Sequence, residues 1–456
     1  MNHLPFWVVY STHINTNLTY KHTAMNATTC MESILPCRNT PVLVADAPFK
    51  TEIVQSINRI LPDVWQNAIA EKGNPFMQYA YLKALEQSHA PKMRFRYALF
   101  THCGQPIGAA CFQLFTVAGN EALKKPTANS ELHTENNTVA PASLRNRAKR
   151  KLQQILHNSI SKMRVNMLVC GNALLTAECG VLFKPQCPPQ QRFELLNHAI
   201  TQIKSEEAAL GNPVHLIMVK DFLPHHAPDA RRLLQYRFRE LHFQPNMVLT
   251  LPPHWSCFDD YLQAMSSKYR VRTKRVLTKG NKLQMKDLNA NDINLLLPDV
   301  YRFYTEVSES VDFNLFTATP EYFTSLKTQM PQHFFMRGCF LHNQIEGFMC
   351  AFVINKHMEV HFTGYNHQLN KDFSIYSNML YDMVCLGLQQ GVHTISFGRT
   401  ALEIKSTIGA EAVNMPAFVK HTGFFMNSII APLINQFNQT HWTPRHPFKQ
   451  ETEAVS

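Results

Sequence analysis

The sequence predicts an α+β fold in which one order of helices and strands occurs twice. Its 456 residues are 45% hydrophobic and 17% charged, which suffices for two ordinary domains with sizeable cores. Two stretches of strand-forming residues, 96–115 and 334–354, each have the pattern of a β-hairpin. Helical patterns precede each hairpin, and a strand, a helix and another strand follow it. This repetition predicts two domains, each a mixed sheet flanked by helices.

The first half opens on two helical patterns. One is predicted by apolar residues at helical spacing, namely Ile53, Ile57, Ile60, Leu61 and Trp65. The other covers 74–86, where Asn74 is a suitable cap and Pro75 fits the first turn. The further elements expected in this half are a hairpin at 96–100 and 106–115, a basic helix at 143–162, a strand at 167–170, a helix at 190–210, a strand at 214–219 and a helix at 231–241.

The second half repeats this scheme. Its expected elements are helices at 255–279 and 292–311, a hairpin at 334–341 and 346–354, a strand at 358–365, a helix at 374–390 and a strand at 394–397. We therefore predict an N-terminal domain at 49–245 and a C-terminal domain at 246–425. The flanking predictions are a disordered leader or too early a start at 1–48, a flexible insertion at 119–141 and a tail at 426–456.

Charge and cysteine usage narrow the class of protein. The formal net charge of +11 favours anionic partners such as phosphates, nucleic acid or acidic lipid head groups. The 11 cysteines include no Cys-x-x-Cys pair, which indicates a reducing compartment and argues against a zinc ribbon. The sequence also lacks a phosphate-binding P-loop, a Gly-x-Ser-x-Gly elbow and a His-Glu-x-x-His motif, and we predict no metal site.

A basic helix in the second half has its cations on one stripe. Spacings of four, three, four and three separate Lys268, Arg272, Arg275, Lys279 and Lys282. A merely solvated stripe normally mixes charge signs, yet no acidic residue occurs from 261 to 286. The pattern therefore favours contact with phosphates or lipid head groups. A second basic segment at 143–164 spreads its cations around the helix, so the pattern supports nonspecific attraction to a membrane surface or RNA as well as it supports a defined site.

Three places in the sequence together resemble one known family. They are Asn74-Pro75-Phe76 with Tyr81-Leu82, the basic run from Ser267 to Arg275, and Glu359-Val360-His361-Phe362 with Phe397-Gly398-Arg399 and Glu403-Ile404-Lys405. In these, the chain resembles the Gcn5-related N-acyltransferase (GNAT) superfamily, in the branch of Fem-type peptidyl transferases and peptidoglycan-biosynthesis or biotin-synthesis-like acetyltransferases. The resemblance covers about 50–425 and implies two tandem GNAT-like acyltransferase domains, the second carrying the chemistry and the first shaping the cleft.

The resemblance also implies the reaction. No cofactor stays bound, and the co-substrate is an acyl-CoA, an acyl carrier or an aminoacyl-tRNA. The acceptor is an amine of a cell-envelope precursor or an amino-lipid in a bacterial cell. The expected location is cytoplasmic, with peripheral contact at the anionic inner face of the membrane, and nucleic acid is a partner only if the donor is tRNA. The stretch 370–377 lacks the glycines of the family's pyrophosphate loop, which argues against a short-chain acetyl-CoA donor.

Amine acylation needs a base and a donor to the oxyanion. His361 and Glu403 are alternative bases; a packing role for His361 and an ion pair of Glu403 with Arg399 are the competing interpretations. Lys405 would neutralise donor phosphate or the oxyanion, and Tyr365 or Tyr376 would protonate the leaving group. The predicted donor-binding cations are Lys268, Arg270, Arg272, Arg275, Lys371 and Arg399.

Two other classes of function remain open at this point. A catalytically silent module that binds anionic membrane or nucleic acid would keep the basic helices and tolerate loss of His361, Glu403 and Lys405. A structural scaffold would tolerate loss of both sets of residues.

Overall fold

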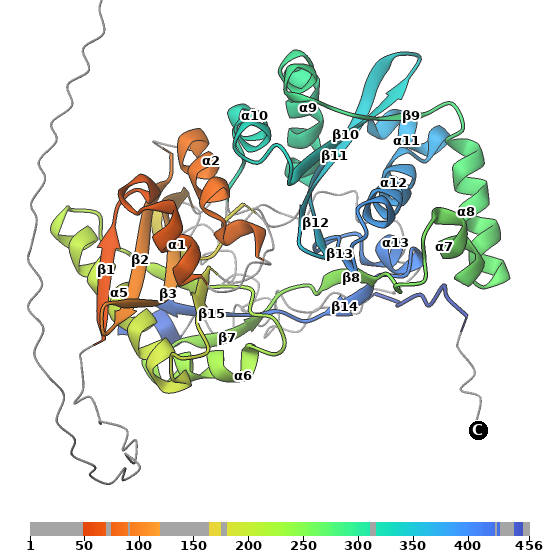
Figure 1. Ribbon diagram of the computed structural model, residues 1–456. Helices are drawn as coiled ribbons and strands as arrows, with labels where there is room; N and C mark the ends of the chain where they lie inside the picture. Colours follow the sequence, from red (N-terminus) through yellow and green to blue (C-terminus); the bar gives the residue numbers. More distant parts are fainter. Residues whose placement is uncertain are drawn as a thin grey trace, which may run out of the picture. The chain divides into compact units, whose positions relative to one another are not determined.

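Two mixed β-sheets organise the chain, one around each predicted hairpin (Figure 1). The computed structural model describes residues 49–69, 74–89, 92–118, 164–174, 180–310, 316–424, 426–428 and 442–449. The predicted leader, the insertion at 119–141 and the basic helix at 143–162 lie outside these residues. Helices flank both sheets, so the predicted α+β class is confirmed.

The first sheet contains the N-terminal hairpin. Every pair of neighbouring strands is antiparallel except β4 and β6, which are parallel. In sheet order the strands are β1 (Lys50–Val54), β2 (Arg94–His102), β3 (Gln105–Ala118), β4 (Arg164–Cys170), β6 (Leu216–Val219), β15 (Pro416–His421) and β7 (Arg239–His242), with β5 (Val181–Phe183) also paired to β3.

The second sheet has the same plan. In sheet order its strands are β14 (Glu411–Val413), β8 (Asn246–Thr250), β13 (Thr394–Ser396), β12 (His357–Tyr365), β11 (Gln344–Ile354), β10 (Phe334–Leu341) and β9 (Gln284–Asp287). Strands β12 and β13 are parallel and pair only through 357–359 and 394–396. From Val360 onward, β12 therefore has β11 but not β13 as a paired neighbour.

The last strand crosses between the two halves. Strand β15 lies between β6 and β7 in the first sheet, although its residues 416–421 fall in the predicted C-terminal domain. Strand β8 occupies the equivalent place in the second sheet, between β13 and β14. Strand β8 of the second sheet begins at Asn246, and the segment after it, through β15, also completes the first sheet.

The helices cover the sheets. They are α1 (Pro62–Ala68), α2 (Tyr79–His89), α5 (Pro189–Ala209), α6 (Ala227–Ala230), α7 (Phe258–Ala264), α8 (Ser267–Lys279), α9 (Ala290–Ser310), α10 (Pro320–Gln329), α11 (His367–Phe373), α12 (Ile375–Gln389) and α13 (Leu402–Thr407), with short 3-10 helices at Ile57–Arg59, Pro75–Met77 and Arg231–Tyr236. Helix α5 packs on the first sheet and α12 on the second. Helices α2, α9 and α10 enclose a third apolar core, to which both halves contribute.

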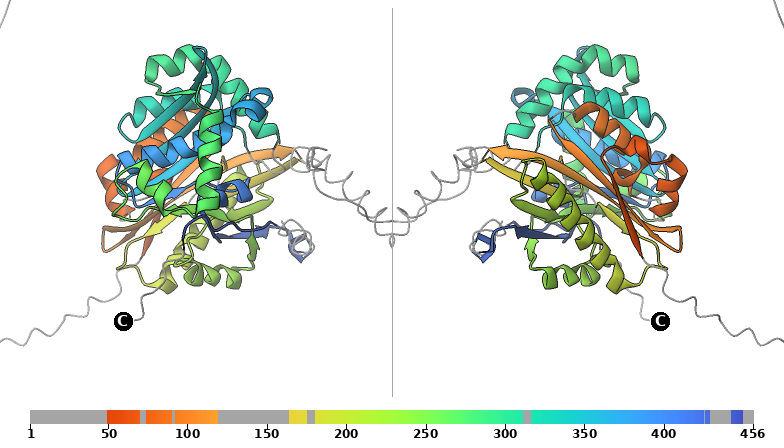
Figure 2. Two further views of the ribbon diagram at one scale, coloured as in Figure 1. Left: turned by 90° about the vertical axis from the view of Figure 1, so that its right-hand side faces the viewer. Right: turned by 90° about the vertical axis from the view of Figure 1, so that its left-hand side faces the viewer.

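Several predicted elements differ from the structure. Ile53 lies in β1 rather than in a helix, because 50–54 pair with β2. The helix predicted at 231–241 is a 3-10 helix that ends where Arg237 adopts a left-handed φ of 69°, and β7 follows it. The helix predicted at 255–279 divides into α7 and α8 at Met265, whose backbone is extended. Figure 2, left, shows α8 on the outer side of the second sheet's helices.

Candidate active site

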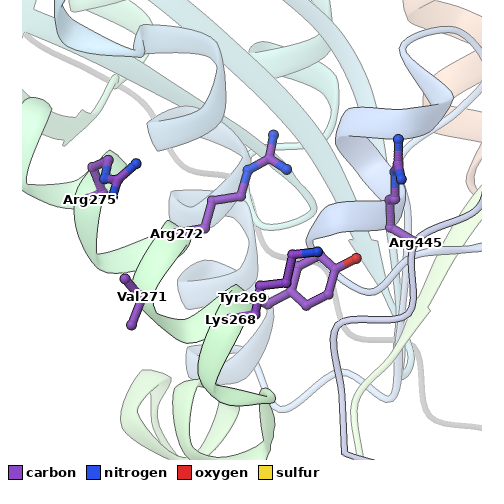
Figure 3. Close-up of a pocket in the computed structure, with 6 residues that line it drawn as sticks. All are labelled: Lys268, Tyr269, Val271, Arg272, Arg275 and Arg445. Atoms are coloured by element: carbon purple, nitrogen blue, oxygen red, sulfur yellow. The ribbon is translucent and has the colours of Figure 1, made fainter.

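Helix α8 presents its cations on an exposed side. Lys268, Arg272 and Arg275 are exposed, whereas Thr273 is buried and its hydroxyl bonds to that of Tyr381 at 2.9 Å. A surface pocket of about 420 Å³ lies along this side (Figure 3), lined by Lys268, Tyr269, Val271, Arg272, Arg275 and Arg445. None of these lining residues is acidic, so the pocket is electropositive and suited to an anion.

Arg445 reaches this pocket from the C-terminal segment 442–449, here called the strap. Main-chain bonds hold the strap to the α7–α8 junction: Ser266 donates its N–H to the carbonyl of Pro447 at 2.8 Å, and Lys449 donates to that of Ala264 at 3.0 Å. The ring of Phe448 packs 5.2 Å from that of Trp255, measured between centroids. The sequence analysis missed Arg445, because no local pattern in the tail indicates where it docks.

Glu403 is the partner of this arginine. The Arg445 guanidinium donates to the exposed Glu403 carboxylate at 3.3 Å. The proposed ion pair between Glu403 and Arg399 is wrong, because α13 begins only at Leu402 and the left-handed φ angles of Thr400 and Ala401 interrupt the helical spacing. Glu403 therefore lies beside the α8 pocket.

Arg399 instead joins the two halves of the chain. Its guanidinium donates to Asp221 at 2.8 Å and to the main-chain carbonyl of Gln244 at 2.6 Å. Asp221 is fully buried and also pairs with Lys220 at 3.0 Å. The predicted donor-binding role of Arg399 thus competes with an ion pair that already engages its guanidinium.

Lys405 is buried beneath the same loop. Its ammonium donates to the main-chain carbonyls of Arg399 at 2.6 Å and Gly398 at 3.3 Å. Burial lowers the pKa of Lys405 to about 7, and the nearby Glu359 carboxylate opposes this shift. The side chain is 4% exposed, so it holds the loop after β13 and does not face the α8 pocket.

The segment that replaces the glycine-rich loop forms α11, which the sequence did not predict. Ser374 after it has a left-handed φ of 50°, and the side-chain oxygen of Asn370 accepts the N–H of Tyr376 at 3.0 Å. One of the main-chain donors at the start of α12 is therefore already satisfied. The main-chain carbonyl of Lys371 accepts the Lys279 ammonium at 3.4 Å, which links α11 to α8.

Two further predicted residues lie near these helices. Arg270 is half-buried on α8 and does not line the pocket. Tyr365, at the end of β12, stacks on Tyr376 with ring centroids 5.4 Å apart, and burial raises its pKa.

His361 lies at an irregularity in β12. The pairing of β11 with β12 shifts between Met349 and Ala351, so that one residue of β11 faces two of β12. Val360 packs in the core under α12, whereas Phe362 packs in the core shared by both halves. The His361 ring lies 4.0 Å from the Phe362 ring, on the shared side.

A chain of side-chain hydrogen bonds connects His361 to the first half. Asn172 donates its amide to the Tyr81 hydroxyl, which bonds to that of Tyr322 at 2.8 Å. The Tyr322 hydroxyl bonds to Nε2 of His361 at 3.0 Å. Nδ1 of His361 is buried and has no hydrogen-bond partner among the described residues. Burial lowers the pKa of His361 to about 3, so the ring is neutral at physiological pH.

Comparisons with known proteins address the fold. No protein-family model matches the chain, and neither does any curated protein sequence. Among solved structures the chain is similar to FemX, with a TM-score of 0.49 over 83% of this chain and 100% of that one. It is also similar to L-PGS from Bacillus licheniformis (TM-score 0.45, 83% and 98%) and to a tandem GNAT protein from the clavulanic acid biosynthesis pathway (0.45, 82% and 99%). Each is 10% identical to this chain, so the likeness concerns fold alone.

Every helix in the described part of the protein is too short or too polar to span a membrane. No group of three or more His, Cys, Asp or Glu side chains is arranged there to hold a metal ion.

Proposed function

We propose that the chain is an N-acyltransferase that moves an acyl group from a phosphate-bearing donor to an amine. The observation that carries this proposal is the α8 pocket, where four cations gather without an acidic lining residue. The pocket belongs to the same half of the chain as β12, which holds a neutral imidazole at its bulge. The sequence resemblance to the GNAT superfamily supplies the reaction class.

The α8 pocket is our proposed site for the donor's phosphates. Its volume of about 420 Å³ suits a small nucleotide, and arginine side chains bind phosphate oxygens in pairs. Asn370 already satisfies one of the main-chain donors at the start of α12, and we assign the phosphates to the cationic side chains of the pocket. Lys371 and the half-buried Arg270 border this region, and we assign them weaker, screened contacts.

The donor we favour is a thioester on a phosphate-bearing arm, such as acyl-CoA or an acyl carrier. His361 faces the core that both halves share, whereas α8, which carries the pocket, packs with α12 on the opposite face of the second sheet. A donor that reaches from the pocket to His361 needs an extended arm between its phosphates and its acyl group. An aminoacyl-tRNA meets the charge requirement but needs a larger basic surface than one pocket.

The roles of the other predicted site residues follow from where their side chains lie. Burial raises the pKa of Tyr365, so it keeps its proton, but its ring stacks on Tyr376 on the α12 face of β12, opposite to His361, and we assign it a packing role rather than protonation of the leaving thiolate. Arg399 and Lys405 are assigned to hold the loop after β13. The acceptor we propose is an amine of a cell-envelope precursor or an amino-lipid at the inner face of a bacterial membrane.

Calorimetric binding of CoA to the purified chain tests the donor site. Arg272→Ala should weaken binding by about 10- to 100-fold, since a hydrogen bond to a charged group contributes about 1.5–3 kcal/mol. Lys274→Ala is the matched control, because Lys274 is exposed on the same helix and does not line the pocket. It should change binding by less than about twofold.

Three results would contradict the donor assignment. Wild-type protein that binds no CoA, or equal losses in the two variants, would show that the pocket is not the phosphate site. Binding to anionic vesicles without binding to CoA would favour the silent membrane-binding module. Mass spectrometry of lipids and wall precursors from cells with and without the gene would then identify the acceptor, since the free amine should accumulate without the enzyme.

A further inference from the structure

The hydrogen-bond chain that ends at His361 has a fixed direction. The side-chain oxygen of Asn172 accepts the main-chain N–H of Leu174 at 3.0 Å, which fixes the orientation of the amide. Its NH₂ group therefore faces the hydroxyl of Tyr81 and can only donate. All the side chains from Asn172 to Tyr322 are buried.

Each hydroxyl in the chain has one proton to donate. Since the Tyr81 oxygen accepts from Asn172, its own proton is directed to Tyr322, the one other partner of this hydroxyl among the described residues. The proton of Tyr322 is then directed to Nε2 of His361. The reverse direction would leave two buried groups unsatisfied, the Tyr81 proton and the lone pair of Nδ1, whereas this direction leaves only the Nδ1 proton. Nε2 is thus an acceptor, and the proton of the neutral ring is on Nδ1.

Nδ1–H is then a buried donor whose partner is not found in the described part of the protein. The rings of Phe76, Phe352 and Phe362 lie 5.9, 5.1 and 4.0 Å from the imidazole, measured between centroids. A buried donor without a partner is costly and rare, which indicates that a ligand supplies the acceptor. Because Nδ1 already carries the proton of the neutral ring, it has no free lone pair and cannot act as a base.

We propose that His361 is a neutral hydrogen-bond donor to the carbonyl oxygen of the transferred acyl group, and not the general base. Tyr322, Tyr81 and Asn172 are positioning residues that fix its tautomer. This role rests on the proposed acyltransferase function.

Acyl transfer from the thioester to the amine does not require His361 to act as a base. The amine nitrogen forms a bond to the thioester carbon, and the carbonyl electron pair moves to the oxygen, where Nδ1–H stabilises the negative charge. The carbonyl re-forms as the C–S bond breaks, and the proton lost by the amine nitrogen passes through solvent to the leaving thiolate. The products are an amide and a thiol.

The tautomer can be measured without substrate. Nitrogen NMR of ¹⁵N-histidine-labelled full-length protein, with the His361 signals assigned by their loss in His361→Gln, should show protonated Nδ1 and unprotonated Nε2. Tyr322→Phe removes the proton donated to Nε2, so the Nε2–H tautomer should become populated, while a thermal melt checks that this variant is folded. A wild-type ring protonated at Nε2 would overturn the proposal.

Two isosteric variants separate a donor from a base. The amide nitrogen of His361→Asn lies near the position of Nδ1, and that of His361→Gln lies near Nε2. We expect His361→Ala to lower kcat by about 100- to 1000-fold, as loss of an oxyanion donor does. His361→Asn should recover at least about tenfold of this loss, and His361→Gln should not.

Different results would contradict the donor role of His361 and the acyltransferase function on which it rests. Equal activity of His361→Asn and His361→Ala, in a wild-type background that acylates amines, would overturn only the donor role. A wild-type protein that binds CoA but transfers no acyl group to any amine acceptor would overturn the acyltransferase assignment, and the donor role with it.

Discussion

We predict that donor binding depends on Phe448, a residue of the strap that does not line the α8 pocket. Phe448 anchors the strap against Trp255, and Arg445, three residues earlier, lines the α8 pocket. Two main-chain hydrogen bonds contribute about 1 kcal/mol each to docking, and the partly buried ring of Phe448 about 1–2 kcal/mol. The entropy lost when the strap becomes ordered opposes these contributions, so the net docking free energy is much smaller than their sum. Phe448→Ala, which removes about 1–2 kcal/mol, should therefore release the strap in most of the molecules.

The expected effect on binding follows from the contribution of Arg445. Arg445→Ala should weaken CoA binding by about 10- to 100-fold, because one charged hydrogen bond contributes about 1.5–3 kcal/mol. Phe448→Ala should weaken it by about 3- to 10-fold. The double variant should bind no more weakly than Arg445→Ala alone, since a released strap affects the pocket only through the missing arginine.

Isothermal titration with CoA of the wild type, Arg445→Ala, Phe448→Ala and the double variant measures this double-mutant cycle. Lys449→Ala is the matched control, because it removes a cation from the same strap that does not line the pocket. It should leave affinity within about twofold of wild type. Additive losses in the double variant, or a Phe448→Ala variant with unchanged affinity, would refute the idea that the strap delivers Arg445 to the donor.

Two further predictions concern the loop that joins the halves. Asp221→Asn should lower the free energy of unfolding by about 3–5 kcal/mol in chemical denaturation, because it leaves Arg399 and Lys220 without their buried counter-charge, while asparagine still tolerates the φ of 65°. Glu240→Gln, at a partly exposed ion pair, is its control and should cost less than about 1 kcal/mol. The pKa of Lys405, lowered from 10.5 to about 7, means that the unfolded chain binds more protons between these values. The free energy of unfolding should therefore rise with pH across this window, more steeply than in Lys405→Met; equal slopes would contradict the assignment.

The elements with a clear spacing of hydrophobic residues could be predicted from the sequence. Both hairpins, the strand at 358–365 and the helices at 190–210 and 374–390 agree with the structure to within a few residues. Short or isolated elements failed, because pairing partners distant in the sequence decide them. Ile53 is in a strand only because β2 lies beside it, and β15 is in the first sheet only because the chain returns there after the second.

The candidate site was predictable only in part for the same reason. The stripe on α8 could be recognised from spacing and from the absence of acidic residues, both of which are local. Arg445 could not, because its place depends on a strap that docks through main-chain bonds and one aromatic ring. Glu403 was assigned the wrong partner, because helical spacing was extended across two residues with left-handed backbone.

His361 shows how far a local pattern can define a chemical role. A histidine on a strand is suited to act as a base, but which nitrogen carries the proton depends on bonds that begin in the other half of the chain, at Asn172 and Tyr81. Those residues are far from His361 in the sequence, and nothing in their local pattern connects them to it. With the hydrogen bonds in the proposed direction, the first half does more than shape a cleft. It fixes the tautomer of the imidazole in the second half, so the two halves act as one site.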